Sequence, residues 1–248
     1  MLVAVTLVDV NAKMVAAWRA TFEEHPEVQI VQGSMLEQPV SAWVSPTNSR
    51  GSMDGGLDAV LKRHFGAAIE KSVQQEIARR YGGLMPVGHA TCVPTGQVQP
   101  GYLISTPTMT QSSENVSDTL NVALACAAAF QAVHMQNARE PGSIRSVALP
   151  GLGANTGQVP VEICADLMWT AYHLFREREF TDFGEMRAAL QEQLGDLAPM
   201  TGATKKTAAK SSPGAVAAAT PASTTASASS AKPTPSAKTK DEDFDDFG

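Results

Sequence analysis

The sequence contains little cysteine, few aromatic residues and no long hydrophobic run. Three of its 248 residues are cysteines, and 6% are Phe, Trp or Tyr. Cys92, Cys126 and Cys164 have no metal-ligand spacing and cannot all pair, which favours reduced thiols packed as small hydrophobic groups. We therefore expect no disulfide framework and no metal site.

An excess of positive charge is also missing. Lys and Arg number 19 against 25 Asp and Glu, giving a formal net charge of −6. An acidic chain is not typical of proteins that bind duplex nucleic acid non-specifically by neutralising phosphates. No apolar segment approaches the roughly 20 residues of a membrane-spanning helix. Strong non-specific nucleic-acid binding by the globular part and a membrane partner are both disfavoured.

The N-terminal segment is apolar but does not have the pattern of a secretory signal. Residues Met1 to Val10 include Asp9, and they have neither a basic start nor a cleavage site of small residues. This pattern predicts a buried strand. The expected location of the protein is therefore the cytoplasm.

A change of composition near Thr201 predicts the domain organisation. Residues 199–240 are almost wholly Ala, Ser, Thr, Pro and Lys, a composition that cannot bury enough apolar surface to offset the entropy of ordering. We expect a folded domain over residues 1–198, a disordered linker over 199–240 and an acidic-aromatic tip over 241–248. The tip carries Phe244 and Phe247 among five acidic residues.

Hydrophobic patterns predict strands that alternate with helices. The predicted strands are Leu2–Val10, Val28–Val31, Ala42–Val44, Gly88–Val93, Tyr102–Ser105 and Ile144–Leu149. The predicted helices are Ala12–Glu24 with Asn11 as N-cap, a long helix from Leu57 that ends before Gly82-Gly83, and a helix to Asn137 capped by Ser117 or Asp118. Two more are expected: one from Pro160 to Arg176, and an amphipathic helix carrying Phe183, Met186, Leu190 and Leu194. Such alternation indicates a three-layer α/β/α domain with a mixed, mainly parallel central sheet.

A first glycine-rich loop follows the predicted strand at Ala42–Val44. It contains Gly51, Gly55 and Gly56, and Asn48 and Asp58 flank these glycines ten residues apart. Glycines before a helix allow a close backbone approach, so the free N–H groups of the helix can face a phosphate. Asn48 can alternatively close a turn through its side chain, and Asp58 can simply favour the helix N-terminus.

A second glycine-rich loop follows the predicted strand at Ile144–Leu149. We expect its backbone N–H groups to clamp phosphates and a side chain at Gly153 to occupy the phosphate position. Asn155 is suited to a left-handed backbone conformation. Both loops leave carboxyl ends of strands, the edge at which open α/β sheets bind ligands. The candidate binding residues of this loop are Gly151, Gly153, Ala154, Asn155, Thr156 and Gly157.

These two loops together resemble the signature of the macrodomain family over roughly Val28 to Phe175. Macrodomains carry an Asn-Ala-Ala-Asn-Ser strand exit, a glycine run and Val-Asp-Gly, with Asn48 and Asp58 at the matching positions. The resemblance implies ADP-ribose as the ligand, with no cofactor. It assigns Asn48 to the distal ribose, Asp58 to a catalytic water or the ribose, and Gly55 and Gly56 to the first phosphate loop.

The chain departs from the family pattern at two places. Gly33-Ser34-Met35 stands where macrodomains commonly have Gly-Asp-Ile, so Ser34 replaces an acid that accepts a hydrogen bond from adenine. No aromatic residue lies between Asn155 and Gln158, where many hydrolytic macrodomains stack a ring on the ribose. Both departures bear on how tightly and how selectively the ligand is held.

Three functions remain open on this sequence. The first is hydrolysis of ADP-ribosyl adducts, with Asn48 fixing the ribose and Asp58 orienting water. The second is a reader that binds ADP-ribose without chemistry. The third is a recruitment or assembly protein acting through its tip, which resembles the acidic ends of single-stranded DNA-binding proteins and offers Phe244 and Phe247 to a protein partner.

Overall fold

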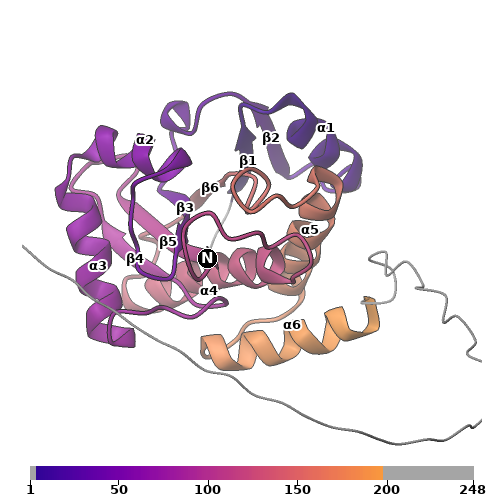
Figure 1. The fold of residues 1–248 in the computed structure, drawn as a ribbon. Helices are drawn as coiled ribbons and strands as arrows, with labels where there is room; N and C mark the ends of the chain where they lie inside the picture. Colours follow the sequence, from indigo (N-terminus) through magenta and orange to yellow (C-terminus); the bar gives the residue numbers. More distant parts are fainter. Residues whose placement is uncertain (1–3, 198–248) are drawn as a thin grey trace, which may run out of the picture. The chain divides into compact units, whose positions relative to one another are not determined.

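A six-stranded sheet forms the centre of the part of the chain that the structure describes, residues 4–197 of a computed structural model (Figure 1). The strand order is β2-β1-β6-β3-β5-β4, and neighbouring strands are parallel except β4 and β5. This mixed, mainly parallel sheet confirms the predicted fold class. The strands are β1 (Ala4–Asp9), β2 (Val28–Gln32), β3 (Ala42–Asn48), β4 (Thr91–Pro94), β5 (Tyr102–Met109) and β6 (Ser146–Leu149).

Helices cover both faces of this sheet (Figure 1). Val147 and Leu149 of β6 belong to one hydrophobic cluster with α1, α4, α5 and α6, whereas Ala148 belongs to another with α2 and α3. Because side chains alternate along a strand, the two clusters lie on opposite faces and the domain has three layers. The helices are α1 (Ala12–Thr21), the 3-10 helix η1 (Met35–Glu37), α2 (Gly56–Phe65), α3 (Ala68–Tyr81), α4 (Asn121–Arg139), α5 (Val161–Glu177) and α6 (Phe183–Leu197).

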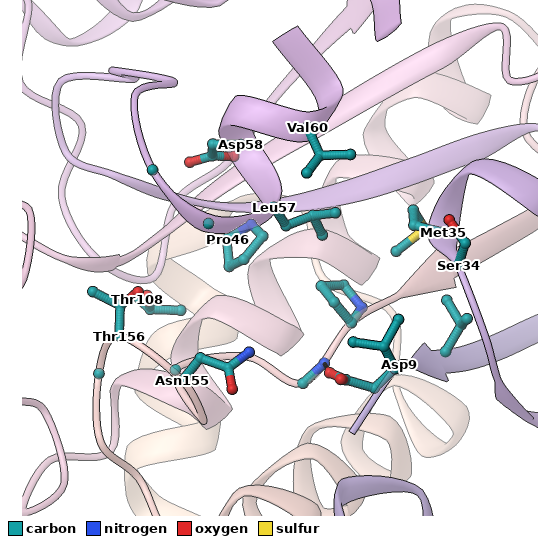
Figure 2. A pocket seen from close by; sticks show the side chains of 18 of the residues that line it. Asp9, Ser34, Met35, Pro46, Leu57, Asp58, Val60, Thr108, Asn155 and Thr156 are labelled. Atoms are coloured by element: carbon teal, nitrogen blue, oxygen red, sulfur yellow. Dashed lines mark hydrogen bonds between the residues drawn. The ribbon is translucent and has the colours of Figure 1, made fainter. Parts of the chain in front are cut away.

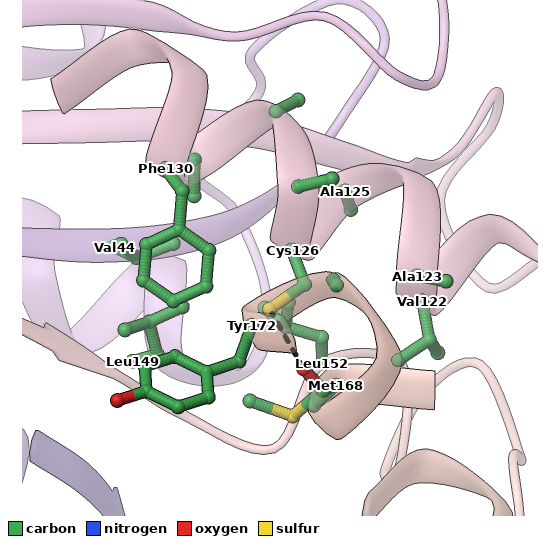
Figure 3. Packing of buried hydrophobic residues seen from close by; sticks show 14 of the residues in the cluster. Val44, Val122, Ala123, Ala125, Cys126, Phe130, Leu149, Leu152, Met168 and Tyr172 are labelled. Atoms are coloured by element: carbon green, nitrogen blue, oxygen red, sulfur yellow. Dashed lines mark hydrogen bonds between the residues drawn. The ribbon is translucent and has the colours of Figure 1, made fainter. Parts of the chain in front are cut away.

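The larger cluster is built around the alanine-rich helix α4, which packs on α5 (Figure 3). The many alanines of α4 suit close packing, and the Phe130 ring stacks on Phe175 of α5 with 4.7 Å between the ring centroids. Cys126 is buried here, and its thiol donates to the carbonyl oxygen of Met168 at 3.9 Å. The prediction that this cysteine packs as a small hydrophobic group is confirmed.

Helix ends test the capping predictions. Asn11 caps α1 as predicted, since its side chain accepts a hydrogen bond from the Lys13 N–H. Neither Ser117 nor Asp118 caps α4, because both lie in a turn before it and the Thr119 hydroxyl accepts from the N–H of Asn121 at 3.3 Å. That prediction was wrong because the helix begins later than expected: its N-cap position is Leu120, whose side chain cannot accept a hydrogen bond.

Two elements differ in length from the prediction. The predicted single helix from Leu57 is two helices, α2 and α3, separated at Gly66, whose φ of 85° ends α2. Strand β3 continues four residues further than predicted and includes Pro46. β3 pairs with β6 only at Ala42 and Trp43, so beyond Trp43 this edge of β3 makes no strand pairing with β6. Pro46, which has no N–H to donate, is tolerated there.

The predicted linker, residues 199–240, and the predicted tip, residues 241–248, lie outside the described residues, as does the end of the predicted domain at residue 198. Within residues 4–197, no helix has the combination of length and apolar character that crossing a membrane requires.

Candidate functional site

A cavity of about 390 Å³ lies at the carboxyl ends of the parallel strands. Residues at or just beyond the ends of β1, β2, β3, β5 and β6 contribute to it, at the edge where open α/β sheets bind ligands. Asn48 and Ala154 are the two predicted site residues that do not line it. Ten others do, several of them visible in Figure 2: Gly33, Ser34, Gly55, Gly56, Asp58, Gly151, Gly153, Asn155, Thr156 and Gly157.

The first glycine loop ends at the N-terminus of α2. Gly55 is the N-cap residue, and no side chain caps the helix start, so the first N–H groups of α2 are available to a ligand. A Cβ atom at Gly55 would meet no atom within 4 Å, whereas one at Gly51 would lie 2.7 Å from Cδ1 of Ile77. Gly51 therefore permits packing against α3, while Gly55 keeps one wall of the cavity open.

Asp58 lies in the first turn of α2, faces the cavity and is only 7% exposed. Its Oδ1 accepts a short hydrogen bond from the hydroxyl of Ser45 on β3. Burial raises the pKa of Asp58 to about 7; the Ser45 hydrogen bond opposes this shift, and the nearby charge of Asp54 adds to it. Asp58 can therefore exist in both protonation states near neutral pH.

Asn48 is placed differently from its predicted role. Its side chain is 7% exposed and does not line the cavity. Its amide NH₂ donates to the Ser112 hydroxyl at 3.0 Å and to the Ser52 carbonyl at 3.3 Å. Its amide oxygen accepts from the N–H groups of Arg50 and Ser52. This geometry matches the alternative prediction, an asparagine that closes a turn through its side chain. Both amide hydrogens are engaged, so donation to a ribose requires one of these two hydrogen bonds to break.

The second glycine loop is held by close backbone packing. Gly153 has a φ of 71°, and a Cβ atom there would lie 3.2 Å from Cγ2 of Val122, so a side chain would meet the core instead of a phosphate. The prediction for Gly153 was wrong on this point. At Gly157 a Cβ would come within 2.6 Å of the Gly153 carbonyl oxygen. The non-glycine residue with a left-handed backbone in this loop is Gln158, with a φ of 59°, and not Asn155.

Asp9 at the end of β1 also lines the cavity and was not predicted as a site residue. Its carboxylate accepts from the N–H of Asn11 at 2.8 Å and from the N–H of Gly151 at 3.1 Å. Its carbonyl oxygen accepts from the Gly33 N–H at 3.0 Å. Asp9 thus ties together three of the loops around the cavity. The available signal was an acidic residue at the carboxyl end of an apolar strand.

Ser34 lies on the Asp9 side of the cavity (Figure 2). Its hydroxyl oxygen accepts from the Leu36 N–H at 3.1 Å and thereby caps η1. The hydroxyl hydrogen remains able to donate to a ligand. Two apolar side chains that line the same cavity, Met35 and the 74% exposed Val10, supply surface suited to a flat base.

The ionisable side chains that line the cavity are acidic. Among the residues that line it, Asp9 and Asp58 carry ionisable side chains, and none is Lys, Arg or His. An anionic ligand would therefore be held by backbone N–H groups and the N-terminus of α2.

A second cavity, of about 590 Å³, lies between α4 and α5 and is lined by Val5 from the start of β1. Its polar lining is already paired: Tyr172 donates to Glu27 at 2.9 Å, and Arg176 donates to Tyr172 at 3.0 Å and forms an ion pair with Glu27. The smaller cavity, with open glycine loops and a titrating carboxyl, is the better candidate site.

Comparisons with known proteins agree with this choice. The Macro domain family model matches residues 44–168, which include Asn48, Asp58 and the second glycine loop. The chain is 31% identical over 142 residues to an uncharacterized protein of Aquifex aeolicus, covering 57% of this chain and 78% of that protein. It is 30% identical over 135 residues to a macro domain-containing protein of Streptomyces nogalater, covering 54% of this chain and 70% of that protein.

Among solved structures, the macrodomain of Mycobacterium tuberculosis DarG is similar, with 22% sequence identity and a TM-score of 0.49. That similarity covers 59% of this chain and 90% of the other.

Proposed function

The chain belongs to the Macro domain family, and we propose that its cavity binds ADP-ribose, either free or as an adduct on another molecule. The observation that carries the proposal is the pairing of two glycine loops with a buried carboxyl at one sheet edge. The cavity volume falls in the range of small-molecule sites.

In the proposed complex the diphosphate lies between the N-terminus of α2 and the loop from Gly153 to Gly157. Free N–H groups at a helix start and in glycine-rich turns suit phosphate oxygens. The adenosine points toward Ser34 and Met35, and the terminal ribose points toward Asp58. This orientation places the base on the apolar side and the sugar beside the titrating carboxyl.

We further propose that the protein hydrolyses an ADP-ribosyl adduct. Asp58 in its ionised form takes a proton from a water molecule, and the water oxygen bonds to the anomeric carbon of the terminal ribose. The bond from that carbon to the modified group breaks, and the leaving group takes up a proton. A pKa of about 7 supports this role, because a general base works best when its pKa is close to the working pH.

The reader alternative has its own support. The Asn48 amide is engaged within its loop, and Ser45 occupies one oxygen of Asp58. A site with these groups fixed can bind ADP-ribose and release it unchanged.

Calorimetric titration with ADP-ribose, beside AMP and ribose 5-phosphate, tests the binding proposal. We expect a micromolar Kd, about −7 to −8 kcal/mol, and weaker binding of the two fragments. Absence of heat and of any thermal shift at millimolar ADP-ribose would contradict it.

Turnover of an ADP-ribosylated substrate by the wild type and by Asp58→Ala separates hydrolase from reader. For a hydrolase the substitution should lower turnover at least about tenfold while changing ADP-ribose affinity much less. Equal losses in both would make Asp58 a binding residue. A wild-type protein that leaves carboxylate-linked and nucleobase-linked adducts intact would favour the reader.

A further inference from the structure

Thr108, near the end of β5, carries a buried hydroxyl that the fold does not use. The residue is 1% exposed, and its Oγ1 has no hydrogen-bond partner among the described residues. Its carbonyl oxygen, in contrast, accepts from the Asn121 side chain at 2.9 Å. A buried hydroxyl without a partner costs free energy, so each such group in a folded protein calls for an explanation.

The location of Thr108 distinguishes it from the other unpartnered groups. Of the buried side-chain atoms without a partner in residues 4–197, only the Thr108 hydroxyl belongs to a residue that lines the candidate cavity. Figure 2 shows Thr108 on the same side of the cavity as Asp58 and Thr156, with Asp9, Ser34 and Met35 on the opposite side. Thr108 is therefore at the end assigned to the terminal ribose.

The backbone gives an independent reason for this placement. Thr47 of β3 is in register with Pro107 of β5, but the next residue, Asn48, is in register with Met109. Thr108 is thus skipped in the pairing, as the extra residue of a β-bulge is. Bulges occur frequently beside functional sites, where they redirect a side chain.

We propose that the Thr108 hydroxyl is a specificity contact that donates a hydrogen bond to an oxygen of the terminal ribose. This inference rests on the proposed binding of ADP-ribose and adds a residue that distinguishes ADP-ribose from ADP. In the complex this contact supplies the hydrogen-bond partner that the Thr108 hydroxyl lacks in the free protein. A site that hydrogen-bonds a substrate group discriminates against the analogue lacking it.

Thr108→Val tests the inference, because valine has the same shape and lacks the hydroxyl. Calorimetry with ADP-ribose should show a Kd raised roughly three- to tenfold, the effect of one lost hydrogen bond, while the Kd for ADP stays unchanged. Thr108→Ser, which keeps the hydroxyl, should retain most of the affinity for ADP-ribose.

Thr91→Val is the matched control. Thr91 on β4 is also fully buried with an unpartnered hydroxyl, but it does not line the cavity. Both valine variants should melt at or above the wild-type temperature, because each removes an unsatisfied buried group. Only Thr108→Val should lose affinity for ADP-ribose.

Three results would overturn the inference. Unchanged ADP-ribose affinity in Thr108→Val would show that the hydroxyl makes no contact, and an equal loss for ADP and ADP-ribose would show that it does not recognise the sugar. A loss shared with Thr91→Val would point to a general effect on the sheet. A wild type that binds no ADP-ribose would instead refute the proposed function itself.

Discussion

Asp58 shows how one buried carboxyl links stability to pH. Burial raises its pKa from an ordinary value of 3.8 to about 7, so the folded chain binds this proton more tightly than the unfolded chain. Between about pH 4 and 7 the folded state therefore holds more protons, and the contribution of Asp58 to stability falls as the pH rises through this range. Above pH 7 the folded chain has to accommodate a buried negative charge.

The variant Asp58→Asn should remove that pH-dependent cost. Between pH 5 and pH 8 the stability of the variant relative to the wild type should rise by roughly 2–3 kcal/mol, because over this range the folded wild type holds the Asp58 proton that the unfolded chain has already released. Urea unfolding at both pH values measures the difference, and subtracting the two proteins removes the contribution of other groups, such as Glu27, whose pKa is lowered to about 2. Wild-type and variant curves that stay parallel from pH 5 to 8 would contradict the assignment.

The sequence located polar residues near the ends of the strands but did not show what each side chain contacts. Asn48 sits at the predicted strand exit, yet its amide is held by Ser112, 64 positions away in the chain. Asp9 contacts Gly151 across 142 positions, and no local pattern reveals that pairing. Roles that depend on contacts between distant segments need the folded chain.

At the scale of elements, replacing a glycine by valine should have opposite effects at the N-terminus of α2 and in the second glycine loop. Gly55 has an extended backbone, with φ −145°, and open space around its Cβ position, so Gly55→Val should leave the melting temperature unchanged. The new side chain borders the cavity and should weaken ADP-ribose binding at least about tenfold. Thermal melting and calorimetry on one preparation measure both effects.

Gly153→Val serves as the contrasting variant. The left-handed φ and the contact with Val122 should destabilise it by roughly 1–3 kcal/mol. Two results would contradict the assignment of Gly55 to ligand binding and Gly153 to stability: a Gly55→Val protein with unchanged ADP-ribose affinity, or one whose melting temperature is as low as that of Gly153→Val.

Hydrophobic periodicity predicted the number of strands and the order in which strands and helices alternate, because each element buries one face in the core. The same periodicity concealed the break between α2 and α3. Leu61, Ile69 and Val73 all pack in the cluster beneath both helices, so the apolar stripe continues across Gly66. The extension of β3 through Pro46 depended on which neighbours pair with it, and pairing partners are not encoded locally.

For the whole molecule, the cavity and the predicted tip are separate in the sequence. All residues lining the cavity fall between Val8 and Gly157, and the buried residues of the described chain end with Leu194 on α6. Ligand binding and the hydrophobic core thus draw on residues that precede the acidic-aromatic segment.

Deleting residues 241–248 should therefore leave thermal stability and ADP-ribose affinity unchanged while removing at least one protein from a pull-down. Phe244 and Phe247 are the large apolar groups of the tip, and aromatic anchors carry much of the binding energy of short segments.

Replacing both phenylalanines of the tip by Ala, with the acidic residues kept, should abolish the same capture as the deletion. Neutralising the five acids to Asn and Gln, with both rings kept, should weaken capture and reduce its sensitivity to salt, because charge attraction is screened at high ionic strength. An identical set of captured proteins for the full chain and the deletion would leave the cavity as the site on which the function of this chain depends.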